Sequence, residues 1–329
     1  MGGLNHVNAL KRLPRLIMDG PGSRFYSITH ISFQGAKRDM YRCFTYGSCL
    51  AFFEATTAHS LVEFIGRHDN NYVGGSPVHA STLLREAKEN SYLLPGVKAL
   101  RMSTTQVPDT LRRDIQERLT PNLHIMYGMT EIGWATVADP EAVRNIPGVV
   151  GKPLPGVQVD VVNEEGETLP PGHTGRIRAK GPGMLKGFIG EPAGTAEAFK
   201  GDWFYSGDLG ELTADGQLIH HGRADDMMIF DGINIYPVEI ENALLHHPAV
   251  AEVSAFSIRS VERGDIPVAA VEIKSKVSED ELRSHCRSWL GAHTPRRLMI
   301  VPKIPRNDVG KILKNELVSL FHRWINQRR

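Results

Sequence analysis

The stretch GRADD at residues 222–226, followed by FDGINIYPVEIE at residues 230–241, decides how this chain is divided. Upstream of it, short alternating strands are separated by turn sequences. Downstream, a helix signal opens at Pro237, whose fixed φ suits the first helical turn. Because the pattern changes here, we predict a domain junction at residues 223–226 and a compact α+β domain over residues 226–329.

Two further patterns precede the junction. Residues 25–126 alternate apolar runs such as LHIMYG with helical stretches such as STLLREAKEN, a rhythm typical of strand-helix-strand layers. From about residue 145 to residue 222, short strands such as VQVDVV, GRIRAK and GQLIHH are broken by EEG, PPG and ADG turns. We therefore predict an α/β fold, with a layered large domain over residues 1–222 that contains a β-rich subdomain.

Composition and charge limit the classes of function. Of 329 residues, 41% are hydrophobic and 23% charged, as in an ordinary globular protein. The 38 Lys and Arg residues balance 37 Asp and Glu residues, so the net charge of +1 predicts no general affinity for nucleic acid or an anionic membrane. No apolar run approaches the roughly 20 residues of a membrane helix, and the start lacks a signal-peptide core.

Cysteine and histidine usage argues against a zinc site. The three cysteines have no Cys-x-x-Cys spacing, which disfavours a zinc cluster or a disulfide framework and favours the cytoplasm. The histidine pairs at 220–221 and 246–247 have no acidic or cysteine companions, so we expect satisfied or exposed surface residues there.

Four motifs carry residues suited to nucleotide chemistry. Tyr127-Gly128-Met129-Thr130-Glu131 follows an apolar run, so we place it where a strand ends and a loop begins, the position at which α/β sheets bind ligands. Tyr205-Ser206-Gly207-Asp208 sets two acceptor oxygens after a glycine, which suits the vicinal hydroxyls of ribose. The junction stretch is the third motif, and Pro305–Lys311, ending in a Gly-Lys pair, is the fourth.

In this order and spacing, the four motifs resemble those of the adenylate-forming superfamily of acyl-CoA synthetases, adenylation domains and luciferases. The resemblance implies a ligase that activates a small-molecule carboxylic acid with ATP as an acyl-adenylate and passes the acyl group to a thiol, with coenzyme A as the leading acceptor. ATP or AMP, Mg²⁺ and coenzyme A are the cofactors that it implies.

The resemblance also assigns roles to the residues of the first two motifs. In the family, the tyrosine matched by Tyr127, beside Gly128, flanks the adenine. The Thr130 hydroxyl bonds the α-phosphate, and the Glu131 carboxylate helps to hold Mg²⁺, as suits a hard anionic oxygen. By the same resemblance, the Asp208 carboxylate would accept hydrogen bonds from the ribose hydroxyls.

The junction and the tail supply the remaining roles. The family places Arg223 near ribose and phosphate, uses Asp225 as the hinge of the small domain, and lets a pantetheine arm pass close to Gly232. Lys311 is the predicted catalytic residue, since it would pair carboxylate and α-phosphate oxygens and stabilise developing charge. One crevice is expected to gather the main groups: Thr130, Glu131, Asp208, Arg223 and Lys311.

The acyl pocket is indicated by two aromatic residues. Phe33 matches the aromatic or histidine that the family places beside the acyl group, and Trp134 follows the glutamate on a pocket loop. Both favour a hydrophobic or aryl acid, and no carboxylate stands out to bind an α-amine. Lys37 and Arg38 are either contacts for a second substrate carboxylate or, as is more usual for paired basic residues, a solvated pair.

The sequence departs from the family in two places. It lacks the Ser/Thr/Gly-rich loop, ending in lysine, that wraps the β- and γ-phosphates, and residues 3–8 resemble the segment after that loop. Residues 103–106, STTQ, lie where the family has a glycine-rich adenine-binding turn. We therefore expect the N-terminal part of the large domain to be missing, with charge-assisted hydrogen bonds of roughly 1.5–3 kcal/mol each lost from ATP binding.

Two alternatives to an active ligase follow from these departures. One is a catalytically impaired or non-catalytic homologue that binds adenylates. The other is one chain of a split ligase, in which a companion chain covers apolar surface that the missing layer would otherwise bury.

Overall fold

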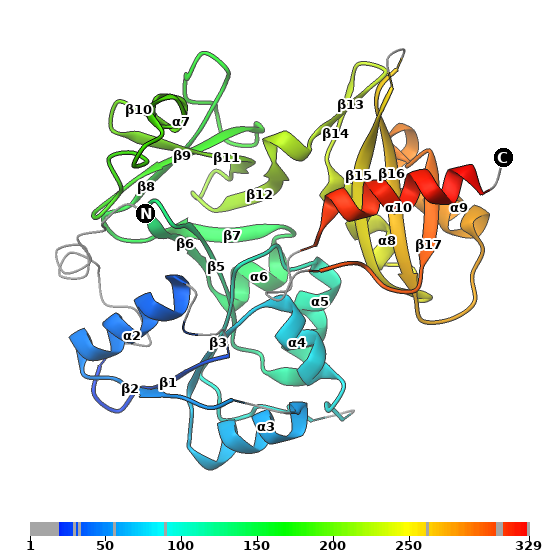
Figure 1. Cartoon of the computed structure of the whole chain (residues 1–329). Coiled ribbons are helices and arrows are strands. Elements are labelled where there is room, and N and C mark those ends of the chain that lie inside the picture. Colours follow the sequence, from blue (N-terminus) through cyan, green and yellow to red (C-terminus); the bar gives the residue numbers. More distant parts are fainter. Residues whose placement is uncertain are drawn as a thin grey trace. The chain divides into compact units, whose positions relative to one another are not determined.

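The structure is a computed structural model that describes residues 20–28, 31, 34–54, 57–88, 91–260, 263–306 and 312–327 (Figure 1). The chain forms two compact units, Met1–His220 and His221–Arg329. No helix in the described ranges combines the length and the apolar character needed to cross a bilayer.

A sheet of twelve strands organises the first unit (Figure 1). Its first five strands are parallel in the order β2-β1-β3-β4-β5. They are β1 (Arg24–Ser27), β2 (Cys49–Ala51), β3 (Tyr72–Gly75), β4 (Ala99–Met102) and β5 (Leu123–Met129). Alternate side chains point to opposite faces, so Phe25 and Tyr26 enter different hydrophobic cores.

Helices cover both faces of these parallel strands, as the predicted α/β layers require. Helix α2 (Gln34–Tyr46) covers the face of Phe25, where its Cys43 packs. The other face is covered by α3 (Ala58–Arg67), α4 (Pro77–Leu84), α5 (Asp109–Asp114) and its π-helical extension η1 (Ile115–Leu119). Burial on both faces explains why the strands read as continuous apolar runs.

The helix expected over STLLREAKEN differs in extent from the helix found. Helix α4 begins at Pro77 and ends at Leu84, before the polar half of the predicted stretch. The start is set by Pro77 in the first turn and by Ser76, whose N–H donates to His79 Nδ1 at 3.2 Å. The cap therefore places this helix several residues earlier than the apolar pattern suggested.

The same sheet continues in antiparallel strands, in the order β6-β7-β12-β11-β9-β8. These are β6 (Gly133–Ala138), β7 (Val149–Pro153), β8 (Gln158–Val162), β9 (Gly175–Lys180), β11 (Trp203–Leu212) and β12 (Leu218–Arg223), with β10 (Phe199–Lys200) beside β11. Two short helices accompany them, α6 (Pro140–Asn145) and α7 (Pro192–Ala198). The β-rich pattern of the sequence thus corresponds to antiparallel strands that extend a parallel sheet.

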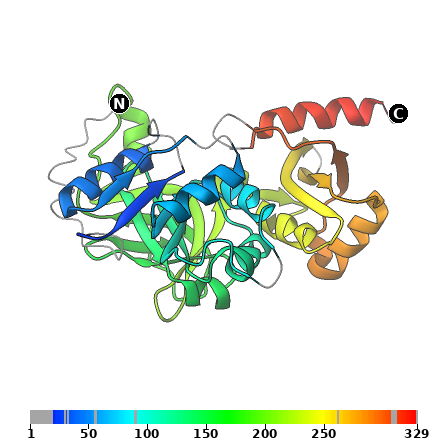
Figure 2. The same ribbon diagram turned by 90° about the horizontal axis from the view of Figure 1, so that it is seen from below.

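The second unit is an α+β fold around a five-stranded sheet. The sheet contains β13 (Met228–Phe230), β14 (Ile233–Ile235), β15 (Val250–Ser260), β16 (Gly264–Ile273) and β17 (Arg297–Val301). Helices α8 (Pro237–Leu245) and α9 (Glu279–Leu290) pack on one face and α10 (Lys314–Asn326) on the other (Figure 2). Pro237 begins α8 as predicted, and the short helices η2 (Ala224–Asp226) and η3 (Gly291–His293) complete the unit.

Candidate active site

The structure brings together Tyr127 and Asp208, two predicted nucleotide-binding residues from distant parts of the chain. The Tyr127 hydroxyl donates a hydrogen bond to Asp208 Oδ2 at 2.6 Å. Tyr127 lies on β5 and Asp208 on β11, and in the sheet order β6, β7 and β12 lie between these strands. The side chains can meet only because the sheet curves.

A third residue, His220, completes this group. Its ring centroid lies 5.4 Å from that of Tyr127, and its Nε2 lies 3.8 Å from Asp208 Oδ1. The His220 and Asp208 side chains are only 15% and 13% exposed. We call Tyr127, Asp208 and His220 the Tyr-Asp-His cluster.

His220 was not predicted as a site residue, because it belongs to an adjacent histidine pair that was expected to be satisfied or exposed at the surface. The available signal was strand alternation. Leu218 is fully buried, and residues two apart on a strand share a face, so His220 follows it inward on β12.

An irregularity in β11 orients Asp208. The register of β11 against β9 shifts within residues 205–209, where Gly207 has a φ of 75°. The Ser206 hydroxyl accepts the Asp208 N–H at 3.1 Å and donates to the Ile177 carbonyl at 3.2 Å. A bulge of this kind re-aims a side chain, and here it explains why a glycine precedes the carboxylate inside a strand.

The motif at residues 127–131 spans the end of β5 and the start of its turn into β6, which agrees with its predicted placement where a strand ends and a loop begins. β5 includes the first three residues, and only Thr130 and Glu131 lie in the turn. Gly128 is required because a Cβ there would overlap the Gly133 carbonyl oxygen. Thr130 is exposed and Glu131 half-buried, and neither side chain has a hydrogen bond or ion pair with a described residue.

The predicted acyl-pocket residues divide into one that the structure describes and one that it does not. Trp134 lies on β6 and packs against α2, with its Cζ2 3.8 Å from the position of a Cβ on Gly35. Phe33 lies outside the described residues, as do Lys311 and the segment at residues 3–8.

The second unit contains Arg223, Asp225 and Gly232. Arg223 Nη2 lies 3.2 Å from Asp225 Oδ2, at the start of η2. Asp231 and Gly232 have φ values of 50° and 79° and form the two-residue turn between β13 and β14. The turn by itself is a sufficient reason for the glycine, so the pantetheine contact of Gly232 stays a prediction.

The remainder of the junction stretch builds the small unit. Glu239 accepts a hydrogen bond from His293 Nδ1 at 2.8 Å. The Glu241 carboxylate accepts the Ala255 N–H at 2.9 Å, and burial raises the pKa of Glu241. Contacts within this unit therefore explain why glutamates stand at these two positions of the motif.

The segment at residues 103–106 keeps a glycine-like backbone without a glycine. Thr104 has a φ of 82°, in the left-handed region that β-branched residues rarely adopt. The neighbouring Ser103 N–H donates to the Gly75 carbonyl at 3.2 Å. At Thr104 the backbone therefore adopts a conformation that suits glycine, at a strain of about 1–2 kcal/mol.

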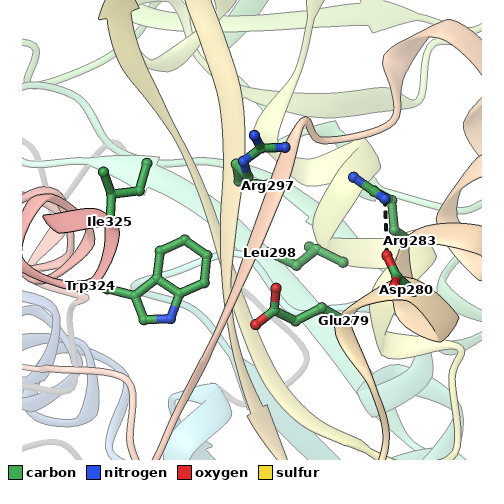
Figure 3. A pocket seen from close by; sticks show the side chains of 7 residues that line it. All are labelled: Glu279, Asp280, Arg283, Arg297, Leu298, Trp324 and Ile325. Atoms are coloured by element: carbon green, nitrogen blue, oxygen red, sulfur yellow. Dashed lines mark hydrogen bonds and ion pairs between the residues drawn. The ribbon is translucent and has the colours of Figure 1, made fainter. Parts of the chain in front are cut away.

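A cavity of about 430 Å³ lies in the second unit between α9, β17 and α10 (Figure 3). Arg283 and Asp280 pair with each other at 3.0 Å on one side of it. None of its lining residues is a predicted site residue, so we do not assign the nucleotide to it. The lining consists of Glu279, Asp280, Arg283, Arg297, Leu298, Trp324 and Ile325.

Together, the curved α/β sheet with its Tyr-Asp-His cluster and the small α+β unit define an adenylate-forming protein. The model of the AMP-binding enzyme family matches residues 4–189, and that of the AMP-binding enzyme C-terminal domain matches residues 239–311. The first match covers more than half of the chain, and the chain belongs to the AMP-binding enzyme family.

Two of the relatives that the chain matches are CoA ligases. The chain is 39% identical over 200 residues to the 2-succinylbenzoate–CoA ligase of Geobacillus kaustophilus, across 59% of this chain and 40% of the ligase. It is 32% identical over 193 residues to the long-chain-fatty-acid–CoA ligase of Escherichia coli O6:H1, across 58% of this chain and 34% of the ligase.

A solved structure is similar over almost the whole chain. The O-succinylbenzoate coenzyme A synthetase from Bacillus subtilis, in complex with AMP, superposes with a TM-score of 0.82 at 25% identity. The match covers 95% of this chain and 63% of the synthetase. The chain therefore spans less than two thirds of the length of each of these relatives.

Proposed function

We propose that this protein activates a small-molecule carboxylic acid with ATP as an acyl-adenylate and transfers the acyl group to the thiol of coenzyme A. The observation that carries the proposal is the hydrogen bond between Tyr127 and Asp208, which joins two predicted nucleotide-binding residues across three intervening strands. The CoA ligases among the relatives support the class of reaction.

The Tyr-Asp-His cluster suits a nucleoside. A carboxylate offers about four acceptor sites for hydroxyl donors such as those of ribose, and one oxygen of Asp208 already accepts the bond from Tyr127. The aromatic rings of Tyr127 and His220 offer flat apolar surface beside it for adenine.

The β5–β6 turn suits phosphate and Mg²⁺. Thr130 presents an exposed hydroxyl for the α-phosphate, and the Glu131 carboxylate has no bond or ion pair with any described side chain. No group of three or more His, Cys, Asp or Glu side chains in the described ranges could hold a metal, so a cation at Glu131 would share its ligands with the nucleotide phosphates. When bound, Mg²⁺ would neutralise phosphate charge.

The chemistry divides into two half-reactions. First, a carboxylate oxygen of the substrate attacks the α-phosphorus of ATP and pyrophosphate leaves. Then the thiol sulfur of coenzyme A attacks the acyl carbon and AMP leaves. By resemblance, Lys311 stabilises the charge that develops in the first step, Arg223 contacts the nucleotide, and the small unit swings about Asp225 between the steps.

The variant Lys311→Ala tests this division. We expect pyrophosphate exchange to fall by about 10²-fold or more, because removing a preorganised transition-state contact has an effect of this size. Thioester formation from a supplied acyl-adenylate should be spared. Lys303→Ala, at an exposed lysine a few residues earlier, is the matched control. Equal loss of both half-reactions, or a wild-type protein that binds AMP without any exchange, contradicts the proposed activity.

We also propose that a companion polypeptide covers the β2 edge of the large sheet. Among the described strands, β2 is the terminal one of the sheet, and edge strands offer unpaired backbone groups to other chains. Nearby, Phe44 on α2 and Phe52 after β2 are 71% and 65% exposed.

Size-exclusion chromatography tests the companion, using as the probe the N-terminal part of the Geobacillus ligase that lies outside its match to this chain. We expect co-elution that Phe52→Ser weakens and Ile189→Ser, at another highly exposed apolar residue, does not. Separate elution of the two polypeptides would refute the companion.

We place the protein in the cytoplasm, where ATP and coenzyme A are available. Cys49 is an exposed free thiol, which a reducing compartment preserves. Recovery of the protein from an exported or membrane fraction would contradict this location.

A further inference from the structure

Helix α2 places two adjacent basic residues in different surroundings. Lys37 is exposed, whereas Arg38 is half-buried and turns toward β6. A Cβ on Gly133 would overlap the Arg38 guanidinium, so the cation lies directly against the backbone of this glycine. Gly133 stands between Glu131 of the proposed phosphate turn and Trp134 of the proposed acyl pocket.

Within the described part of the chain, Arg38 has no hydrogen-bond or ion-pair partner. The adjacent carboxylate, Asp39, gives both of its oxygens to Arg101, and both of those side chains are buried. Burial lowers the pKa of Arg38, Asp39 opposes this effect and Arg42 adds to it. The guanidinium still carries its charge at neutral pH, and partly buried charges are normally paired.

Trp134 supplies a second donor at the same place. Its indole Nε1 is buried and has no hydrogen-bond partner among the residues that the structure describes, although a buried indole N–H usually has one. The ring packs against Gly35, which precedes Arg38 by one helical turn and shares its face of α2. The Arg38 guanidinium, against Gly133, and the Trp134 indole, against Gly35, therefore both lie where α2 meets β6.

We propose that Arg38, assisted by the Trp134 indole N–H, binds a second carboxylate on the acid substrate, so that this protein selects dicarboxylic acids with an apolar or aryl linker. The inference rests on the proposed function and on the predicted acyl pocket at Trp134, which lies on β6 just after the β5–β6 turn. A planar guanidinium suits this role because it can bind a carboxylate through two parallel hydrogen bonds. Lys37, pointing to solvent, takes no part.

Calorimetry with two matched ligands tests the inference. One is the acyl-sulfamoyl adenosine made from 2-succinylbenzoate, which keeps a free carboxylate, and the other is its carboxamide analogue. We expect the wild-type protein to bind the carboxylate at least about tenfold more tightly, the ratio that one charge-assisted hydrogen bond supports. Arg38→Met should abolish the preference and leave AMP affinity unchanged, whereas Lys37→Met should retain it.

The outcomes separate the inference from the proposed function. Equal affinity of the wild-type protein for the two ligands, with AMP still bound, overturns the role of Arg38 and leaves the adenylate site standing. Failure to bind AMP and both ligands overturns the proposed function and this inference with it. Parallel loss of AMP and ligand affinity in Arg38→Met, not rescued by Arg38→Lys, assigns Arg38 a purely structural role and also overturns it.

Discussion

Removing the Asp208 carboxylate is expected to weaken AMP binding by about 10²-fold to 10⁴-fold. The side chain is 13% exposed, so little water competes for its oxygens. Asp208→Ala removes two charge-assisted hydrogen bonds to the ribose hydroxyls, at roughly 1.5–3 kcal/mol each. The binding free energy of AMP should therefore fall by about 3–6 kcal/mol. At about 1.4 kcal/mol per tenfold change, this gives the stated range.

The assay is calorimetric titration with AMP and with 2′,3′-dideoxy-AMP, which lacks both hydroxyls. The wild-type protein should bind dideoxy-AMP more weakly than AMP. The factor should be about the same as the factor by which Asp208→Ala weakens AMP binding. Asp208→Ala should bind the two ligands equally, because the diol has no acceptor left. Tyr127→Phe keeps the ring and the carboxylate, so its AMP affinity should fall by less than about tenfold.

The reasoning is refuted if Asp208→Ala weakens AMP and dideoxy-AMP by the same factor, since Asp208 would then support the fold instead of the diol. Urea unfolding provides the check on folding. Loss of the hydrogen bond from Tyr127 should lower the free energy of unfolding by only about 1 kcal/mol.

Thr104→Gly should raise the free energy of unfolding by about 1 kcal/mol, because it relieves a left-handed β-branched residue; a lower melting temperature would show that the threonine side chain makes contacts that outweigh the strain. Asp39→Asn should lower the free energy of unfolding by about 3 kcal/mol, because it breaks the buried pair with Arg101. Its control, Glu63→Gln, removes the exposed ion pair with Arg67. It should change the free energy of unfolding, measured in guanidinium chloride, by less than about 1 kcal/mol. Similar effects of both substitutions would contradict a stabilising role for the buried pair.

A local signal predicted the first helix of the small unit, because Pro237 marks the first turn of α8. The hairpin turn at Asp231 and Gly232 was not predicted, although an Asp-Gly pair is a strong local signal for one. The layered large domain was readable from apolar runs. The extent of α4 was not, because Ser76 sets its start and lies outside the apolar pattern.

The assembly of the candidate site depends on tertiary structure that no local pattern records. The motifs identified Tyr127 and Asp208 separately, but their contact follows from the curvature of a sheet that separates their strands by three others. Basic residues show the same limit. Lys37 and Arg38 look equivalent in the sequence, and only the packing of α2 against β6 distinguishes the exposed cation from the half-buried one.

A crystal structure with AMP bound tests the central claim most directly. The account predicts that both ribose hydroxyls lie about 2.5–2.7 Å from the Asp208 carboxylate oxygens, with the adenine beside Tyr127. AMP bound elsewhere, with no ribose hydroxyl within hydrogen-bond distance of the Asp208 carboxylate, would contradict it.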